Sequence, residues 1–274
     1  MNSHVPPPVD KSPERIRRMF GTIAYRYDLI NNVLTLGIDR LWRKRTVQKL
    51  LHDQTADGDI LDVCCGTGEL SLAFLKQQQK ERRAYAIRRD IYGIDFTPEM
   101  IEIAQRKAKR CSLPPGGQQH TFWQPTFSVG DALGLPFEDD RFAMVAIAFG
   151  LRNLCDHQQG LVEMVRVCKP GGIVAVLDFS MPTLPILRQC YRFYFHTVLP
   201  RLGQWFAKNP DRAYSYLPES VLHFDQPAQL AERLAQLGVT DVQMKPMTFG
   251  IVTLVCGRKQ NRPNSTSDVI RLVS

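Results

Sequence analysis

The segment from Leu61 to Gly68 most constrains how this chain can fold, because it reads as a short buried strand that ends in a glycine turn. Its sequence has the form hydrophobic-Asp-hydrophobic-x-x-Gly-x-Gly. Glycines at the end of the first parallel strand let a ligand approach the backbone, and the following helix points free N–H groups at it. The turn lacks the third glycine of G-x-G-x-x-G and the Lys-Ser/Thr of a phosphate loop, which disfavours a dinucleotide or a nucleoside triphosphate.

Short apolar runs alternate with helix-like stretches along most of the chain. Strands are expected at residues 60–63, 91–94, 127–129, 144–149 and 173–177, and a closing antiparallel pair at 239–247 and 251–258. Helices are expected at residues 14–31, 39–51, 69–79, 98–110, 158–167 and 227–237. Near-continuous apolar strands between helices are typical of parallel strands buried on both faces. The pattern predicts an α/β fold, a Rossmann-like doubly wound sheet of seven strands.

Composition also predicts how the chain is divided. The aromatic-rich segment 181–224 interrupts the alternation and is expected to form a helical lid on the sheet. Two inserted stretches, 77–90 and 111–125, are expected to be surface loops without a site, and residues 169–172 a turn. The expected divisions are a disordered N-terminus at 1–13, an N-terminal helical cover at 14–57, the main domain at 58–258 and a flexible tail at 259–274.

Charge and cysteine usage limit the possible partners and compartment. The formal net charge is +8, which fits either a solvated basic surface or attraction to an anionic nucleic acid, membrane face or substrate. The seven cysteines include no CxxC and no Cys/His spacing for zinc, so no metal site is expected. The sequence holds no secretory signal and no apolar run of the roughly 20 residues that a membrane span requires. We therefore expect a cytoplasmic protein, at most peripheral to the inner face of a membrane.

Acidic residues end the second and third expected strands. Asp95 lies where an acid in a doubly wound fold accepts hydrogen bonds from ribose hydroxyls. Asp131 can accept a hydrogen bond from an adenine amino group, and the small Ala132 leaves space beside the ring. Each acid alone could merely cap a helix. Together with Asp62 they suit a nucleoside that carries a sulfonium cation better than one that carries a phosphate.

These residues resemble class I S-adenosylmethionine-dependent methyltransferases. Further blocks resemble one family, the ubiquinone/menaquinone biosynthesis C-methyltransferases, and follow its order from Arg15 to Gly257. The blocks are Tyr25 to Asn32 with Gly37 and Trp42, Leu135-Pro136-Phe137, Phe149 to Asn153, Arg166 to Gly172, Phe179-Ser180, Leu199-Pro200-Arg201 and Tyr214 to Ser220. Two departures are Ala148, where relatives often have Ser, and Asp39, where they often have His.

The resemblance implies S-adenosylmethionine as the cofactor and assigns roles by position. The residues implied to contact the cofactor are Asp62, Gly66, Thr67, Gly68, Asp95, Asp131, Ala132 and Ala148. Arg152 and Asn153 are the candidate catalytic residues, and Tyr27, Asp28, Tyr214 and Tyr216 are candidates for the substrate pocket.

The implied reaction is methylation of a ring carbon in a prenylated quinol, with demethylmenaquinol converted to menaquinol. The same reaction in ubiquinone or phylloquinone biosynthesis is the alternative within the family. Arg152 would steady the developing phenolate or order a water that takes the ring proton; alternatively it pairs with a local acid. The lid and N-terminal helices would cover the prenyl tail, or simply pack on the sheet. The positive net charge would suit docking on an anionic membrane.

Two rival functions belong to other classes. A nucleic-acid methyltransferase is disfavoured, because no dense Lys/Arg stripe with interleaved aromatics and no Asn-Pro-Pro-Tyr-type motif occurs. A non-catalytic module that binds the cofactor or a lipid is disfavoured by the acids and by the Arg152-Asn153 pair. We therefore expect no nucleic-acid partner, and the sequence leaves the oligomeric state open.

Overall fold

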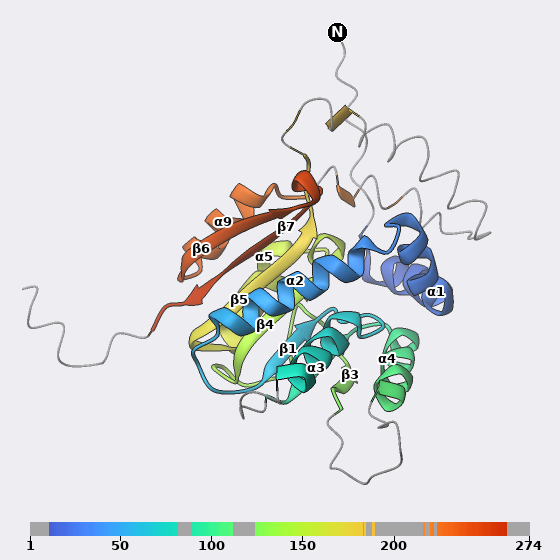
Figure 1. Ribbon diagram of the computed structural model, residues 1–274, viewed down its shortest axis with the longest axis horizontal. Helices are drawn as coiled ribbons and strands as arrows, with labels where there is room; N and C mark the ends of the chain where they lie inside the picture. Colours follow the sequence, from blue (N-terminus) through green and yellow to red (C-terminus); the bar gives the residue numbers. More distant parts are fainter. Residues whose placement is uncertain are drawn as a thin grey trace, which may run out of the picture.

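A seven-stranded sheet forms the centre of the computed structural model (Figure 1). The structure describes residues 11–81, 89–111, 124–182, 184, 188–189, 216, 220–221 and 224–261. The strand order is β3-β2-β1-β4-β5-β7-β6. The strands are β1 (Ile60–Val63), β2 (Ile91–Asp95), β3 (Thr126–Val129), β4 (Phe142–Ala148), β5 (Cys168–Phe179), β6 (Val239–Met247) and β7 (Val252–Lys259). The predicted α/β fold is confirmed.

The direction of the strands places a ligand-binding edge at one end of the sheet. Neighbouring strands from β3 to β5 pair in parallel, whereas β7 is antiparallel to β5 and β6 to β7. The chain moves outward from β1 to β2 and β3, then returns to β4 on the other side of β1. In such sheets ligands bind beyond the carboxyl ends of the strands, where the order reverses.

Helices cover both faces of the sheet. The helices are α1 (Pro13–Leu34), α2 (Ile38–Asp53), α3 (Glu69–Glu81), α4 (Pro98–Cys111), α5 (His157–Val167) and α9 (Pro227–Gln236), with short 3-10 turns η1 (Leu151–Asn153) and η3 (Thr248–Gly250). Core side chains of α2, α3 and α4 cluster on one face, and those of α5 and α9 on the other. Figure 1 shows α2 and α3 in front of the sheet, with α1 beyond its edge.

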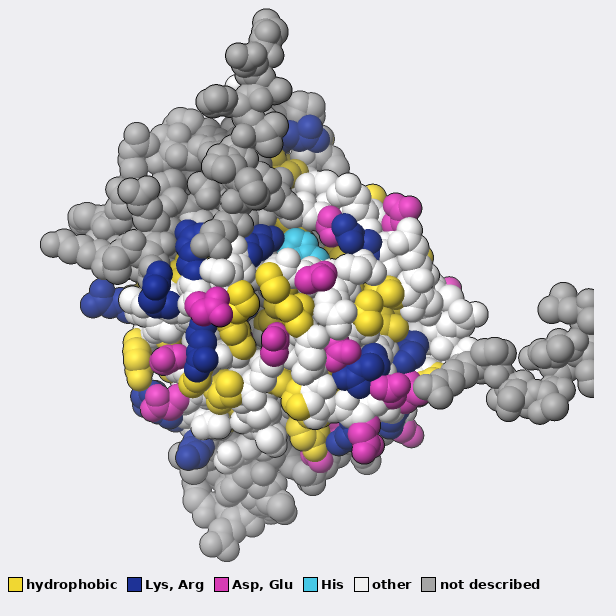
Figure 2. Space-filling model, turned by 180° about the vertical axis from the view of Figure 1, so that it is seen from behind, with side chains coloured by type: hydrophobic (Ala, Val, Ile, Leu, Met, Phe, Trp, Pro, Cys, Tyr) yellow, Lys and Arg dark blue, Asp and Glu magenta, His cyan; other side chains and the backbone are white. Residues whose placement is uncertain are grey.

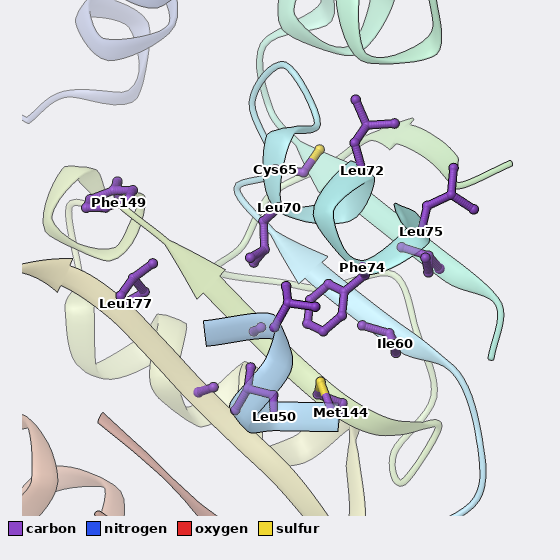
Figure 3. Close-up of a cluster of buried hydrophobic side chains, with 14 of the residues drawn as sticks. Leu50, Ile60, Cys65, Leu70, Leu72, Phe74, Leu75, Met144, Phe149 and Leu177 are labelled. Carbon is purple, nitrogen blue, oxygen red and sulfur yellow. The ribbon is translucent and has the colours of Figure 1, made fainter. Parts of the chain in front are cut away.

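Buried apolar side chains on both faces hold these layers together. In β4, Met144 belongs to the cluster beneath α2 and α3, while its neighbour Val145 belongs to the cluster beneath α5 and α9. This alternation follows from the two-residue period of a strand. In Figure 3, Phe74 of α3 and Leu50 of α2 converge above Met144. A strand that must be apolar on both faces explains why the sequence pattern was near-continuous rather than alternating.

The predicted turn at residues 169–172 is wrong, because β5 continues through these residues. Phe142 of β4 pairs with Cys168, and the next pair joins Met144 to Ile173, so the extra residues form a bulge in β5. Gly171 takes a left-handed conformation with a φ of 73°. A β-bulge absorbs such an insertion without ending the strand.

The predicted surface loop at 77–90 is wrong at both of its ends. The helix α3 continues to Glu81, and Gln78 within it is buried. The Gln78 amide accepts a hydrogen bond from Arg89 N at 3.0 Å and donates one to Arg89 O at 3.2 Å. One side chain therefore fixes the backbone that leads into β2. Residues 82–88 lie outside the described part of the chain.

The other predicted elements lie within a few residues of their expected ends. Pro13 is the first residue of α1, with Ser12 as its N-cap, as a proline at the first helical position predicts, and Lys259 is the last residue of β7. Most of the predicted lid, 181–224, and most of the loop 111–125 lie outside the described residues. No helix in the described part of the chain combines the length and apolar character that crossing a bilayer requires.

Two glycines with similar backbones provide a matched test of packing at the start of α3. A Cβ added to Gly68 (φ 81°) would lie 2.9 Å from the Phe127 ring, whereas one added to Gly238 (φ 82°) meets nothing within 4 Å. We expect Gly238→Ala to cost about 1–2 kcal/mol for the left-handed backbone alone. Gly68→Ala should lose a further ~1–3 kcal/mol through the clash.

The measurement is the free energy of unfolding of both variants in urea. Equal losses would show that the glycine turn is not tightly packed against β3.

Candidate functional site

A cleft opens at the carboxyl ends of the central strands. Its space amounts to about 1050 Å³, including the opening to solvent. The glycine turn after β1, the ends of β2, β3 and β4, and the first turns of α1 line this cleft. The lining brings together most of the residues predicted to contact a cofactor: Asp62, Gly66, Thr67, Asp95, Asp131, Ala132 and Ala148. The topology therefore gathers side chains that are far apart in the sequence.

The backbone of the glycine turn leaves room for a ligand. Gly66 has a φ of 54°, and a Cβ added there would meet nothing within 4 Å. Its N–H donates a hydrogen bond to Asp95 Oδ2 at 2.9 Å. Gly68, by contrast, is not among the lining residues, and its missing Cβ makes room for Phe127 instead. The sequence analysis grouped the two glycines, but the structure gives them different roles.

Two buried carboxylates face the cleft. Asp62 is 1% exposed and accepts hydrogen bonds from Ser71 N at 3.0 Å and Ser71 Oγ at 2.6 Å. Asp95 accepts hydrogen bonds from Gly66 N and, at 2.9 Å, from Thr97 N. Burial raises the pKa of Asp62 to about 7 and raises the pKa of Asp95 above its usual range. These donors are neutral, so a cationic ligand would stabilise both ionised carboxylates.

The third predicted acid is arranged differently. Asp131 is exposed and accepts a hydrogen bond from Leu133 N at 2.9 Å, so it also shapes the turn after β3. The next residue, Ala132, is buried at the cleft wall. Asp131 therefore caps a local turn and also lines the cleft, while its hydrogen bond to an adenine stays a prediction.

Thr67 and Asp28 belong to a charge cluster that joins α1 to the glycine turn. The Thr67 hydroxyl donates a hydrogen bond to Asp28 Oδ1 at 2.6 Å. Lys107 of α4 forms ion pairs with Asp28 and with Glu69, and donates to Thr67 Oγ1 at 3.0 Å. Asp28, predicted to contact substrate, lines neither this cleft nor the cavity that adjoins it. Nothing in the sequence linked Lys107 to the site, because its partners lie about 40 or more positions away.

A second cavity adjoins the first. Five residues line both: Phe20, Tyr27, Arg43, Phe149 and Asn153. The remaining lining is mostly apolar and aromatic: Met19, Ile23, Ile30, Asn31, Asp39, Trp42, Arg152, Phe179 and Tyr216. All four predicted catalytic and aromatic residues on the described chain, Arg152, Asn153, Tyr27 and Tyr216, therefore surround one space. The predicted Tyr214 lies outside the described residues.

Arg152 pairs with a buried acid while it lines the second cavity. Its Nη1 donates hydrogen bonds to Asp178 Oδ1 at 2.7 Å and to Phe149 O at 2.6 Å. The local ion pair considered as an alternative in the sequence analysis therefore exists. Arg152 Nε is buried and has no hydrogen-bond partner among the described residues. These bonds hold the guanidinium in place and leave its Nε–H without a partner among the described residues.

Neighbouring polar groups complete this wall. Tyr216 donates a hydrogen bond from its hydroxyl to Asn153 Oδ1 at 3.1 Å, and Asn153 Nδ2 donates to Phe149 O at 3.3 Å. Burial raises the pKa of Tyr216 to about 12, so the phenol stays neutral. The Tyr216 hydroxyl therefore helps to orient Asn153.

Arg43 is a second cation at the cavity, and the sequence analysis missed it. Arg43 forms a buried ion pair with Asp39, one helical turn earlier in α2, and its guanidinium lies 5.2 Å from the centre of the Phe149 ring. Thr35 Oγ1 donates to Asp39 Oδ1 at 3.0 Å. The opposite charges at i and i+4 were the available signal. The described residues contain no cluster of acids, histidines or cysteines that could hold a metal ion.

Comparisons with known proteins agree on one family. The sequence matches the ubiE/COQ5 methyltransferase family over residues 9–259. A ubiquinone/menaquinone biosynthesis C-methyltransferase of Geobacter sp. (strain M21) is 42% identical over 246 residues, which cover 90% of this chain and 97% of the relative. A demethylmenaquinone methyltransferase of Deinococcus radiodurans is 39% identical over 257 residues, which cover 93% of this chain and 98% of the relative.

Solved structures show the same fold. A S-adenosylmethionine-dependent methyltransferase of Thermotoga maritima superposes with a TM-score of 0.57 at 16% identity, covering 89% of this chain and all (100%) of that one. Human N-acetylserotonin methyltransferase, solved with S-adenosylmethionine, has a TM-score of 0.54 at 18% identity, covering 89% of this chain and 59% of that one. At such identities the likeness concerns the fold alone.

The raised pKa values predict how cofactor affinity depends on pH. Asp62 and Asp95 are more easily protonated than ordinary carboxyls, whereas a sulfonium ligand favours their ionised forms. Binding below pH 7 must therefore release protons. We expect the affinity for S-adenosylmethionine to rise from pH 5.5 to 7.5, by up to about tenfold per pH unit for each carboxyl.

Isothermal titration calorimetry over this range checks the slope. Asp62→Asn should flatten it, while Asp139→Asn, which changes an exposed acid paired with Arg166, should leave it intact. An affinity of the native protein that does not change with pH would contradict the role given to these carboxylates.

Proposed function

The chain belongs to the ubiE/COQ5 methyltransferase family, and from that premise we propose that its substrate is demethylmenaquinol, methylated on a ring carbon. The protein is an S-adenosylmethionine-dependent C-methyltransferase of quinone biosynthesis. The naphthoquinol substrate is favoured by relatives named demethylmenaquinone methyltransferase, from Halalkalibacterium halodurans at 37% identity and from Deinococcus radiodurans at 39%. A benzoquinol precursor is the alternative substrate within the same family.

The first cavity fits the cofactor. Its walls carry two buried carboxylates whose hydrogen-bond donors are neutral, and the space above Gly66 is open. When bound, S-adenosylmethionine supplies a methyl group already activated by a sulfonium. We assign Asp95 to the ribose hydroxyls, and Asp131 with Ala132 to the adenine. Ala148 contributes no side-chain hydrogen bond, and Thr67 already donates its hydroxyl to Asp28.

The second cavity fits an aromatic ring. The observation that carries this assignment is the shared wall: Phe20, Tyr27, Arg43, Phe149 and Asn153 line both cavities. A ring in the second cavity would therefore lie next to the cofactor, as methyl transfer between carbon and sulfur requires. Aromatic side chains would pack on its faces and exclude water.

Arg152 and Arg43 supply positive charge beside that ring. A hydroxyl of the quinol that loses its proton makes the adjacent carbon more nucleophilic, and a fixed guanidinium stabilises the phenolate. Arg152 cannot serve as a base, because guanidinium groups stay protonated in proteins. Its guanidinium, which lines the second cavity, can instead hold the substrate oxygen or orient a water that takes the ring proton. The ion pair with Asp178 keeps the guanidinium in position.

A prenylated substrate also implies where the enzyme works. The tail of such a quinol resides in a membrane, so we propose that the protein acts from the cytoplasmic side through peripheral contact. The net charge of +8 supports attraction to an anionic lipid surface.

The substrate assignment predicts a preference between two rings. Incubated with labelled S-adenosylmethionine and equal amounts of reduced naphthoquinone and benzoquinone precursors, the protein should label the naphthoquinol faster, by about tenfold or more. Chromatography of the extracted quinones checks this outcome. Faster labelling of the benzoquinol would reverse the assignment, and labelled RNA in a parallel reaction would point to a different class of methyltransferase.

The role of Arg152 predicts a loss of turnover without loss of cofactor binding. Arg152→Met alone would leave Asp178 buried without its partner, at a cost of about 3–5 kcal/mol, so the test uses Arg152→Met combined with Asp178→Asn. We expect kcat to fall by about 10²–10³-fold in the double variant.

Arg152→Lys, which keeps a cation beside Asp178, serves as the control and should lose less. Cofactor affinity measured by calorimetry should change little in either protein. Normal turnover by the double variant would remove Arg152 from the reaction.

A further inference from the structure

The outer side of α1 and the start of α2 carry large apolar side chains in water. Leu36 is 86% exposed, Tyr25 68%, Leu29 62% and Leu41 41%. These are four of the eight large hydrophobic side chains that are most exposed on the described chain, and all lie within 17 consecutive positions. We call this surface the α1–α2 face. Single exposed apolar residues are ordinary, but a group of them marks a site of interaction.

The geometry of α1 separates this face from the substrate cavity. Tyr25 and Leu29 are four positions apart and therefore lie on one side of the helix. Residues on the other side, including Ile23, Tyr27 and Ile30, line the second cavity. One helix, about 10 Å across, therefore separates the α1–α2 face from the cavity assigned to the quinol ring.

The turn between α1 and α2 presents a leucine to solvent at some conformational cost. Leu36 has a φ of 51°, a left-handed conformation that non-glycine residues adopt infrequently. Its side chain packs against little of the protein, since most of its surface is exposed. The end of α1 accounts for this backbone, because Leu36 N donates to Val33 O at 3.2 Å and Gly37 N to Asn32 O at 2.8 Å, as in a Schellman motif; the motif leaves the leucine side chain in solvent.

Cations outnumber acids in the segment that carries these apolar side chains, although Glu99 of α4 lies beside Gly21 of α1. In the helical segment 13–45, the exposed charged residues are Glu14, Arg17, Arg18, Arg26, Arg40, Lys44 and Arg45. Six of these seven are basic. The other two acids of the segment are paired with cations, Asp28 with Lys107 and the buried Asp39 with Arg43. At the left of Figure 2, where α1 lies, basic and hydrophobic side chains adjoin one another, with acidic side chains between them.

We propose that the α1–α2 face docks on an anionic lipid bilayer, with its apolar side chains in the interface and its cations against the lipid headgroups. This inference rests on the proposed prenylated substrate. Apolar side chains beside a cluster of Lys and Arg are what an interfacial helix requires. Docking here would bring the second cavity close to the bilayer, so that a ring could enter while its tail stays in lipid.

Two other occupants fit this surface less well. A second copy of the chain meeting it about a two-fold axis would place six cations against six cations. A nucleic acid would pair with the cations, but Leu29 and Leu36 would gain nothing from its phosphates. A bilayer satisfies both the charges and the apolar side chains.

Vesicle co-sedimentation of the full chain tests the proposal. The vesicles are phosphatidylcholine with or without phosphatidylglycerol, at low and high salt. The native protein should bind the anionic vesicles and lose affinity as salt rises. Arg40→Glu with Lys44→Glu should weaken binding by more than about 25-fold, since removing each cation near an anionic surface alone costs roughly fivefold. Leu29→Glu with Leu36→Glu should weaken it at both salt concentrations.

Matched controls lie elsewhere on the molecule. Met244→Glu changes a 50% exposed apolar residue on β6, and Lys80→Glu changes an exposed cation on α3. Both should bind vesicles as the native protein does. Circular dichroism and thermal unfolding establish that all four variants are folded.

Activity distinguishes this inference from the proposed function. On a quinol with a short tail in solution, the face variants should turn over normally; on a long-tailed quinol in anionic vesicles they should lose activity with their binding. Vesicle binding equal to that of the controls would overturn the proposal, as would a change of oligomeric state or of RNA binding without a change of vesicle binding. Failure of the native protein to methylate either quinol would instead overturn the substrate assignment.

Discussion

The hydrogen bond from Gly66 N–H to Asp95 Oδ2 connects the two strand ends on which the site depends. It joins the turn after β1 to the end of β2, so the glycine turn cannot shift without disturbing the carboxylate. Asp95 accepts a second hydrogen bond from Thr97 N, just before α4. Burial nevertheless raises the pKa of Asp95, so these hydrogen bonds do not fully stabilise its ionised form. A cationic ligand would stabilise the ionised carboxylate further.

The helix α1 is fixed to this turn by charge rather than by the main core. Asp28 reaches Thr67 and Lys107, whereas the apolar side of α1 forms its own small cluster with Tyr216. The contact between α1 and the glycine turn closes one side of both cavities. The same helix would carry the substrate wall on its inner side and the membrane contact on its outer side, so cofactor site, substrate site and lipid surface are mechanically linked through one element.

Two buried ion pairs border the second cavity. Arg152 pairs with Asp178, and Arg43 with Asp39. Buried pairs contribute little net stability, because desolvation offsets much of their attraction. Their value in this cavity is orientation: each acid holds a guanidinium beside an aromatic surface, where it can meet an oxygen that gains negative charge.

The sequence by itself determined the elements whose signals are local. Apolar runs indicated the parallel strands. The turn at 61–68 with the acids at 95 and 131 located the cleft, because strand ends in such a sheet must meet at one edge. Local signals were misleading where a distant partner decided the outcome. The Pro-Gly-Gly stretch at 170–172 reads as a turn, but pairing with β4 carries the strand through it.

Only the tertiary structure decided which side chains share a space. Gly66 and Gly68 stand two positions apart, yet one faces the cleft and the other packs on Phe127. Lys107 and Asp178 carried no motif, and their importance comes from partners on other elements. A sequence specifies what each position prefers nearby, whereas ion pairs and cavity walls depend on distances that exist only after the helices have packed on the sheet.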